Sequence, residues 1–187
     1  HLCLRYRKSD VDSLTDIDFN VKRGETIGII GGTGSGKSSV VNMIPRFYDA
    51  CEGEVLVDGI NVKDYAINDL RQKIGIVMQK AVLFKGTIRD NLLWGNENAS
   101  EDDIYEALKV SQALEVVEGK KNGLDSEVAQ GGKNFSGGQK QRLTIARALV
   151  RKPEILILDD SASALDYATD AALRKAIREM DNSATVF

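Results

Sequence analysis

The residues best suited to carry chemistry lie in a glycine-rich loop near the start of the chain. In GGTGSGKSS (31–39), Gly31, Gly36, Lys37 and Ser38 have the spacing G-x-x-x-x-G-K-S. Glycines allow the backbone to curl so that successive N–H groups point at one anion, and a following helix adds its positive end. Lysine can neutralise phosphate oxygens, and a serine hydroxyl can bind Mg²⁺. The stretch therefore predicts a polyphosphate-binding loop that also supplies a metal ligand.

Adjacent carboxylates form the second candidate. In ILILDDSASALD (155–166), four apolar residues lead into Asp159 and Asp160, and a turn of small residues ends in Asp166. Neighbouring negative charges repel each other, so a purely structural segment would gain little from the pair. A hydrophobic strand that ends in Asp, in a chain with a phosphate-binding loop, is typical of the second half of an Mg²⁺ site.

A third candidate, FSGGQKQR (135–142), places Ser136, Gly137 and Gly138 before a stretch rich in Lys and Arg. Taken alone, Ser-Gly-Gly in front of a helix is as consistent with an ordinary N-cap as with a ligand site. A helix N-terminus also attracts anions, so both interpretations stay open on these residues alone.

The elements that must position these residues indicate an α/β core. The runs ETIGII, KIGIVMQ, EILILDD and ATVF are short and nearly continuous in apolar residues, which is typical of strands buried on both faces of a parallel sheet. Helical patterns separate them, as in βαβ units. The glycine-rich loop follows the first run and opens a helical stretch that Pro45 should end or kink.

Other segments predict antiparallel strands and amphipathic helices. TDIDFNVKRG alternates, with Ile17, Phe19 and Val21 on one face, and GEVLVDGINV reads as a hairpin that turns at Asp58-Gly59. Three helices are expected: EDDIYEALKVSQAL behind the N-cap Ser100, GGQKQRLTIARALVRKP, and ATDAALRKAIREM.

The bulk composition fits one domain of 187 residues, with 42% hydrophobic and 28% charged residues. A net charge of −3 argues against binding to nucleic acid or anionic lipid through bulk charge. Cys3 and Cys51 lie far apart in the sequence and are expected to be reduced thiols. No apolar run approaches the ~20 residues that span a bilayer. The chain begins and ends in strand-like segments, so we expect a domain truncated at both ends.

Taken together, these motifs resemble those of the ATP-binding domain of ABC transporters. GGTGSGKSS resembles the Walker A motif, Gln79 in IGIVMQK the Q-loop, FSGGQ the signature motif, ILILDD the Walker B motif and SALD the D-loop. QKAVLFKGTIRDNLLWG resembles exporter-type domains, in which the region after the Q-loop receives the coupling helix of the membrane domain. SEVAQGGKN occupies the position of the exporter X-loop.

The resemblance implies a P-loop NTPase fold with a RecA-like, mainly parallel core sheet, an antiparallel β-subdomain and an inserted helical subdomain. All of it lies in a single domain, 1–187. The expected limits are roughly 1–24 and 52–66 for the β-subdomain, roughly 25–51, 67–80 and 153–187 for the core, and roughly 81–152 for the helical subdomain.

The resemblance also implies ATP and Mg²⁺ as ligands. Tyr6 would stack on adenine, although a strand tyrosine could simply pack on the β-subdomain. The residues expected to contact the phosphates are Gly31, Thr33, Gly34, Ser35, Gly36, Lys37, Ser38 and Ser39. Those expected at the metal are Ser38, Gln79 and Asp159, and those expected to act in hydrolysis are Asp160 and Gln79. Those expected to reach the partner's ATP or order the interface are Ser136, Gly137, Gly138, Gln139 and Asp166.

Two positions depart from the family pattern. Asp160 stands where the family usually has Glu, and Phe135 where the signature usually has Leu. A carboxylate that is one methylene shorter should let ATP bind but position the attacking water poorly. The pattern resembles the degenerate-site half of a heterodimeric multidrug-type exporter. The family's switch histidine would come after Phe187, so we expect weak hydrolysis by these 187 residues alone.

The expected partners are the transmembrane domain of an exporter and a second, non-identical ATP-binding domain in head-to-tail contact, without nucleic acid. The expected place is the cytoplasmic side of the cell membrane. Two rivals remain: a soluble ABC-type ATPase and a nucleotide-binding regulatory module. Phe84 and Trp94 are interpreted as packing residues and not as ligand contacts.

Overall fold

Three short parallel strands form the centre of the computed structural model, which describes residues 1–7, 9–161, 163–180 and 184–187. They are β5 (Ile74–Val77), β8 (Ile155–Leu158) and β9 (Thr185–Val186), in the order β5-β8-β9. Ile74 pairs with Ile155, and Ile155 pairs with Thr185. The prediction that these apolar runs form a buried parallel sheet is therefore confirmed.

The run ETIGII does not form the fourth strand that its composition predicts. Thr26 makes only an isolated parallel bridge to Val186, supported by the bond from Ile27 N–H to the Val186 carbonyl at 2.7 Å. Gly28, Ile29 and Ile30 belong to no strand. Ile30 is 97% exposed. The segment leads into the glycine-rich loop as irregular chain.

Antiparallel pairs flank this centre. β1 (Leu2–Leu4) pairs with β2 (Leu14–Ile17), and β3 (Leu56–Val57) pairs with β4 (Ile60–Asn61). Asp58 and Gly59 both have positive φ, 50° and 77°, as a tight primed hairpin turn requires. The predicted hairpin is therefore confirmed.

The alternating pattern beyond Ile17 is a different case, because β2 ends at that residue. Asp16 already has a φ of 55°, which breaks the extended backbone of the strand. Phe19 is accordingly 52% exposed and does not share a buried face with Ile17. The strand prediction for this stretch is wrong past Ile17.

Seven helices are described within these ranges. They are α1 (Lys37–Met43), α2 (Ile67–Gln72), α3 (Ile88–Leu93), α4 (Glu101–Val110), α5 (Leu114–Glu118), α6 (Gly137–Leu149) and α7 (Tyr167–Arg178). A small antiparallel pair, β6 (Gly86–Thr87) with β7 (Glu127–Val128), and two 3₁₀ turns, Gly123–Asp125 and Gln130–Gly132, complete the set. No helix in the described part of the chain is long and apolar enough to cross a membrane.

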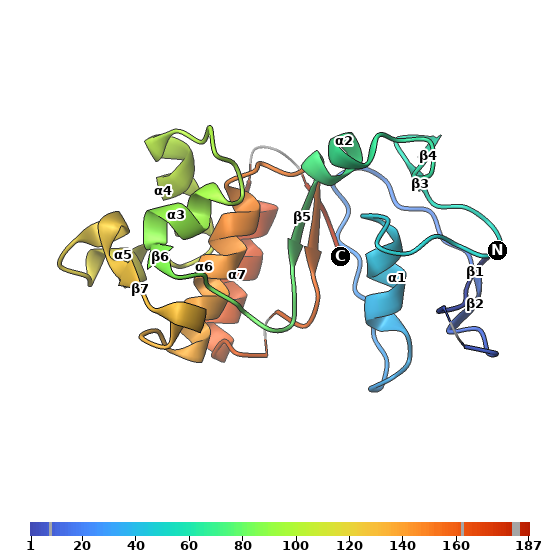
Figure 1. Cartoon of the computed structure of the whole chain (residues 1–187), viewed down its shortest axis with the longest axis horizontal. Coiled ribbons are helices and arrows are strands. Elements are labelled where there is room, and N and C mark those ends of the chain that lie inside the picture. Colours follow the sequence, from blue (N-terminus) through green and yellow to red (C-terminus); the bar gives the residue numbers. More distant parts are fainter. Residues whose placement is uncertain (8, 162, 181–183) are drawn as a thin grey trace.

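The helices α3 to α6 lie on one side of the sheet together with the β6–β7 pair, and α1 lies on the other side with the β1–β2 and β3–β4 pairs (Figure 1). Between β5 and β8 the chain is mostly helical, and its assignment to an inserted helical subdomain stays a prediction. Its large apolar cluster is built from α3, α4 and α6, and it reaches Val77 and Leu156 in the sheet.

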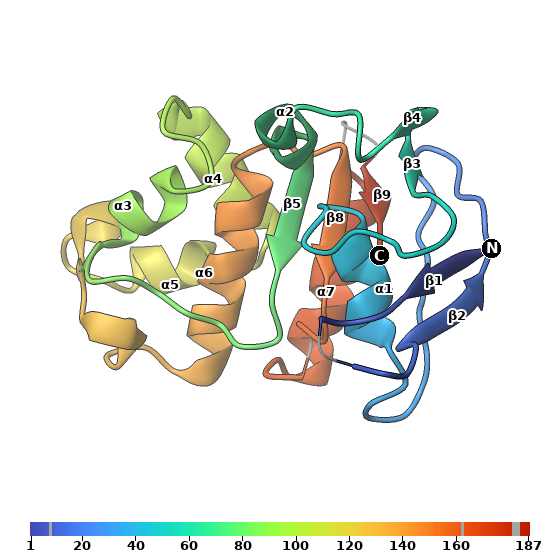
Figure 2. The same cartoon turned by 45° about the vertical axis from the view of Figure 1, so that its right-hand side comes forward.

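Helix α1 is held between two further apolar clusters. Val41 and Ile44 pack with Ile74 and Ile157 of the sheet, whereas Met43 packs in the cluster around β1 and β2. The turned view shows α1 between the sheet and the β1–β2 pair (Figure 2). Packing on two sides therefore holds α1, the helix that follows the glycine-rich loop.

Candidate functional site

The glycine-rich loop turns into α1 through two residues with left-handed backbone. Gly34 has a φ of 82°, and Gly36, the N-cap residue of α1, has a φ of 89°. A Cβ at Gly36 would also lie 2.8 Å from Cδ2 of Leu14. Side-chain-bearing residues rarely adopt this conformation, so both the turn and the close approach of β2 require glycine at position 36.

Lys37 lies over this loop. Its Nζ donates hydrogen bonds to the carbonyl oxygens of Gly31, at 2.8 Å, and of Gly32, at 2.9 Å. These bonds fold the lysine back along the loop that precedes it. The positive charge is thereby held beside the loop, next to the place where an anion could bind.

Ser38 is joined to the end of the central sheet. Its Oγ donates to Oδ1 of Asp159 at 2.9 Å, although the two residues are 121 positions apart in the sequence. Asp159 directly follows β8, and its N–H donates to the carbonyl of Val77 at the end of β5. The structure therefore brings together the hydroxyl and the carboxylate that were predicted to bind the metal ion.

This pair fits Mg²⁺ only if phosphate or water completes the coordination. Among the described residues, no group of three or more His, Cys, Asp or Glu side chains could hold a metal ion. Mg²⁺ binds in this way in phosphate sites, where one or two protein oxygens are joined by substrate phosphates and waters. The hard oxygens of Ser38 and Asp159 suit that ion.

Gln79 and Asp160 form the second contact at this edge of the sheet. Nε2 of Gln79 donates to Oδ2 of Asp160 at 2.9 Å, and each residue lies just beyond the end of its strand. Asp160 has a φ of 49°, a left-handed conformation that Asp tolerates better than most residues. The Oγ of Ser163 donates to the Asp160 carbonyl at 3.0 Å and holds this turn.

Tyr6 lies beside the start of α1. Its hydroxyl is 2.7 Å from Oγ of Ser39, and its ring meets the ring of Tyr48 edge-on, with centroids 4.8 Å apart and planes at 88°. Both the packing interpretation and the predicted stacking on adenine are compatible with this position, so the role of Tyr6 stays a prediction. Tyr48 was not singled out from the sequence, although its place in the aromatic stretch RFYD was a usable signal.

Ser136 and Gln139 form a reciprocal capping box at the start of α6. Oγ of Ser136 accepts from Gln139 N–H at 3.2 Å, and Oε1 of Gln139 accepts from Ser136 N–H at 3.0 Å. The N-cap interpretation is therefore confirmed, and the ligand role stays a prediction. In the described ranges no hydrogen bond or ion pair joins these residues to the loop 31–39.

Asp166 belongs with this second group. A Cβ at Gly138 would lie 3.2 Å from the carbonyl of Ala164, so the start of α6 approaches the turn that leads to Asp166. Asp166 caps α7: it accepts from Thr169 N–H at 3.0 Å and from the Thr169 hydroxyl at 2.7 Å. These bonds, the backbone one first, lower the pKa of Asp166 below its usual value. The predicted site residues thus fall into two separate groups.

Phe84 and Trp94 pack on each other with centroids 4.4 Å apart and planes at 17°. They nevertheless remain 41% and 65% exposed. The guanidinium of Arg147 lies 5.5 Å from the Phe84 ring. These aromatic residues therefore pack at the surface of the helical half and not in its core.

Comparison with known proteins places these motifs in context. The family model described as ABC transporter matches residues 14–163. The chain is 49% identical over 177 residues to the uncharacterized ABC transporter ATP-binding protein YfiB of Bacillus subtilis (strain 168), covering 95% of this chain and 31% of that protein. It is 39% identical over 185 residues to a putative multidrug export ATP-binding/permease protein of Staphylococcus aureus (strain NCTC 8325 / PS 47), covering 99% and 32%. The chain spans about a third of the length of these relatives.

A solved structure is also similar along nearly the whole chain. It is described as a bacterial Atm1-family ABC exporter with ATP bound, and it superposes with a TM-score of 0.92 at 35% identity. The match covers 99% of this chain and 33% of the exporter chain. The fold therefore has a counterpart in that exporter.

Proposed function

The chain belongs to the ABC transporter family as its ATP-binding domain, and from this premise we propose that it binds ATP with Mg²⁺ and powers export of a substrate across a membrane. ATP-binding domains of this family are ATPases. Its relatives include proteins named as multidrug exporters, and LFKGTIRDNL after the Q-loop resembles exporter-type domains. These points favour an exporter over a soluble ABC-type ATPase.

One observation supports this proposal above the others: the bond between Ser38 and Asp159 at 2.9 Å. It joins the end of the glycine-rich loop to the carboxyl end of β8, so one ligand could contact both. Lys37 and the loop N–H groups would hold the phosphates, and Ser38 with Asp159 would hold Mg²⁺. When bound, Mg²⁺ would neutralise charge that develops on the phosphate oxygens.

The second group of residues fits a partner's nucleotide. Ser136 and Gly137 are exposed at the start of α6, where the first N–H groups of the helix favour a negative charge. A second ATP-binding domain in head-to-tail orientation would place its own ATP against this helix end. We propose a non-identical partner domain, with both attached to transmembrane domains on the cytoplasmic side of the membrane.

Asp160 is the residue that we expect to limit hydrolysis at this chain's own site. A general base must come within hydrogen-bond distance of the water that it activates. The shorter carboxylate of Asp160 is bonded to Gln79 at 2.9 Å and lies on a left-handed turn. Both features favour ATP binding with slow turnover. They also keep open the alternative of a nucleotide-binding regulatory module.

Replacing Asp160 by Glu tests this proposal. In the full-length protein that contains this chain, Asp160→Glu should raise the ATP hydrolysis rate about tenfold or more, because general-base catalysis contributes at least that much. The measurement is phosphate release at saturating ATP, with ATP binding followed in parallel.

Two control variants accompany this measurement. Asp102→Glu, an exposed change of the same type on α4, should leave the rate unchanged. Lys37→Ala should abolish binding at this site. An unchanged rate in Asp160→Glu with ATP still bound would show that Asp160 does not limit turnover.

A further inference from the structure

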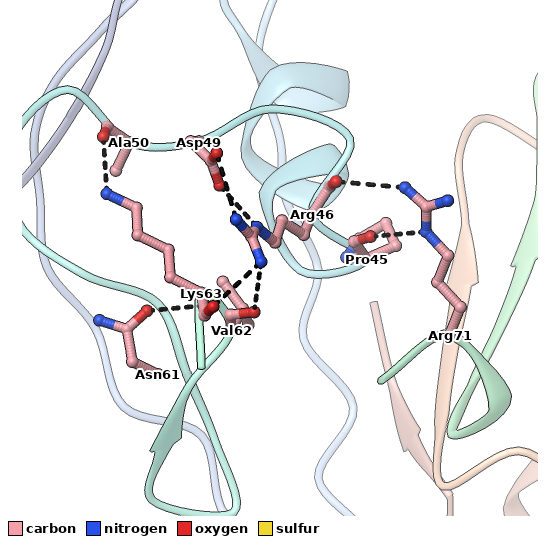
Figure 3. A network of polar contacts seen from close by, with 8 residues as sticks. All are labelled: Pro45, Arg46, Asp49, Ala50, Asn61, Val62, Lys63 and Arg71. Carbon is pink, nitrogen blue, oxygen red and sulfur yellow. Dashed lines mark hydrogen bonds and ion pairs between the residues drawn. The ribbon is translucent and has the colours of Figure 1, made fainter. Parts of the chain in front are cut away.

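Arg71, near the end of α2, reaches across to the chain that follows α1 (Figure 3). Its Nε donates to the carbonyl of Pro45 at 3.1 Å, and its Nη2 donates to the carbonyl of Arg46 at 3.2 Å. The same guanidinium lies over the ring of Phe47, 5.2 Å from its centroid. One side chain thus holds three consecutive residues just beyond the end of a helix, where carbonyl groups lack intrahelical partners.

The backbone at Arg71 is itself held in place, by its neighbour in the sequence and by a hydrogen bond to its carbonyl. The neighbouring Leu70 is fully buried in the cluster beside the central sheet. The carbonyl of Arg71 accepts a bond from Nη1 of Arg151 at 2.8 Å. The guanidinium therefore extends from a fixed support, and its contacts fix the position of the segment that it touches.

A second set of contacts holds the same segment from the other end (Figure 3). Arg46 has a φ of 54°, and its Nε donates to Oδ1 of Asp49 at 2.8 Å. Its Nη1 donates to the carbonyl of Lys63 at 3.1 Å, and Nζ of Lys63 donates to the carbonyl of Ala50 at 3.1 Å. Residues 45–50 are therefore tied to Lys63, just after the β3–β4 hairpin, as well as to α2.

This segment carries Tyr48, whose ring meets Tyr6 edge-on at 4.8 Å. Tyr6 is also fixed at its hydroxyl by Ser39 of α1. The orientation of the Tyr6 ring thus depends on two supports, one from the helix after the phosphate loop and one from the segment that Arg71 holds.

We propose that Arg71 is a positioning residue for the base of the bound nucleotide, acting through Pro45–Phe47, Tyr48 and Tyr6. The proposal rests on the proposed function, in which Tyr6 stacks on adenine. Only arginine offers a planar fork with separate N–H groups for two carbonyls and a flat face for an aromatic ring. Lysine would keep the charge and lose both the fork and the stacking face. The effect of Arg71→Lys should therefore fall on the base and not on the phosphates.

The experiment compares two ligands in the full-length protein by isothermal titration calorimetry with Mg²⁺ present. The first is a non-hydrolysable ATP analogue, and the second is inorganic tripolyphosphate, which has no base. In Arg71→Lys the Kd for the analogue should rise about three- to tenfold, as expected for the loss of one aromatic contact. The Kd for tripolyphosphate should change less than about twofold, which is the usual effect of a substitution remote from the ligand.

A second variant and two controls separate this effect from general damage to the fold. Tyr48 is exposed, so Tyr48→Leu should fold normally and reproduce the effect of Arg71→Lys, whereas Tyr48→Phe should bind like the unmodified protein. Arg174→Lys, a surface change of the same type on α7, should alter neither Kd.

Several results would overturn the inference. They are an unchanged Kd for the analogue in Arg71→Lys and Tyr48→Leu, an equal rise for both ligands, or an unmodified protein that binds the analogue no better than tripolyphosphate. Failure of the unmodified protein to bind either ligand would instead contradict the proposed function.

Discussion

Ser38 and Ser39 are neighbours on α1, yet their hydroxyls have different partners. Ser38 donates to Asp159, whereas Ser39 is paired with Tyr6. Both were predicted to contact phosphates, and the G-x-x-x-x-G-K-S motif assigned only Ser38 to the metal ion as well. The difference arises because residues one apart on a helix project about 100° apart, so one faces the sheet end and the other faces β1.

This difference predicts a difference in Mg²⁺ dependence. The ratio of ATP affinity with Mg²⁺ to that with EDTA should fall about tenfold in Ser38→Ala, because loss of a group at a metal commonly costs that much. Ser39→Ala should leave the ratio unchanged, since its hydroxyl supports Tyr6. Equilibrium binding of ATP in both buffers makes the measurement. Equal ratios in the two variants would contradict the assignment of Ser38 to the metal ion.

For Asp160, the position in the fold could be predicted from the sequence, but the backbone conformation could not. Its position after the hydrophobic strand was predictable, as was its neighbour Gln79 at the end of the adjacent strand. Its φ of 49° was not predictable, because a left-handed residue depends on the turn that follows, here held by Ser163.

At the scale of elements, most of the strands and helices that a local sequence pattern specifies were predicted correctly. The apolar runs at β5, β8 and β9 pair with each other, and the helices predicted at α4, α6 and α7 are present, each with buried apolar residues. The short helix α3 was missed, although Thr87 and Asp90 form a capping box there that the sequence T-x-x-D indicates. The strand expected at 25–30 was wrong, since only Thr26 forms an isolated bridge, and a local pattern does not show which residues pair across a sheet.

A pH-dependent contact joins two elements that are far apart in the sequence. Asp103 in the first turn of α4 accepts from Ser100 N–H and pairs with Nζ of Lys152 at 2.6 Å. The bond to Lys152 and those to Ser100 lower the pKa of Asp103 to about 2. A carboxyl whose folded pKa is depressed stabilises the fold above its unfolded pKa of about 4, and this contribution is lost as pH falls from about 4 towards about 2. The pair therefore links α4 to the loop before β8 at neutral pH.

Substitution of Asp103 tests this sign. The free energy of unfolding of Asp103→Asn should be lower than that of the unmodified protein at pH 6, and the two values should converge as pH falls below 4. Urea unfolding at a series of pH values measures the difference. Asp102→Asn, one residue earlier on the same helix, should not show this convergence. A difference between Asp103→Asn and the unmodified protein that stays constant down to pH 2.5 would contradict the assignment.

At the scale of the whole molecule, the two groups of predicted site residues lie in different halves of the fold. The loop 31–39 is set by α1, which packs between the sheet and the antiparallel strands, whereas Ser136 begins a helix of the helical half (Figure 1). No single-sequence pattern shows how far apart these groups lie, because that distance depends on how the two halves pack. Both groups would be used in a dimer with two sites, in which each site combines the loop group of one chain with the Ser136 group of the other.

That arrangement predicts that substitutions in the two halves of this chain have different effects on ATP hydrolysis. If the partner is non-identical and supplies the competent Walker site, this chain's signature residues act at the site that hydrolyses ATP, and its loop acts at the slow site. Ser136→Arg should then lower total ATP hydrolysis about a hundredfold, because it obstructs the competent site, where such contacts contribute on that order. Lys37→Ala should lower it less than about threefold, because it empties a site that turns over slowly.

In a homodimer each site would contain both residues, so the two variants should be equally inactive. Phosphate release by the assembled complex distinguishes these outcomes, and the intact mass of that complex shows independently whether two different chains are present. Equal inactivation of Ser136→Arg and Lys37→Ala, with a mass of two identical chains, would contradict the heterodimer. Asp160 would then have to be a slow but working catalytic carboxylate in both sites.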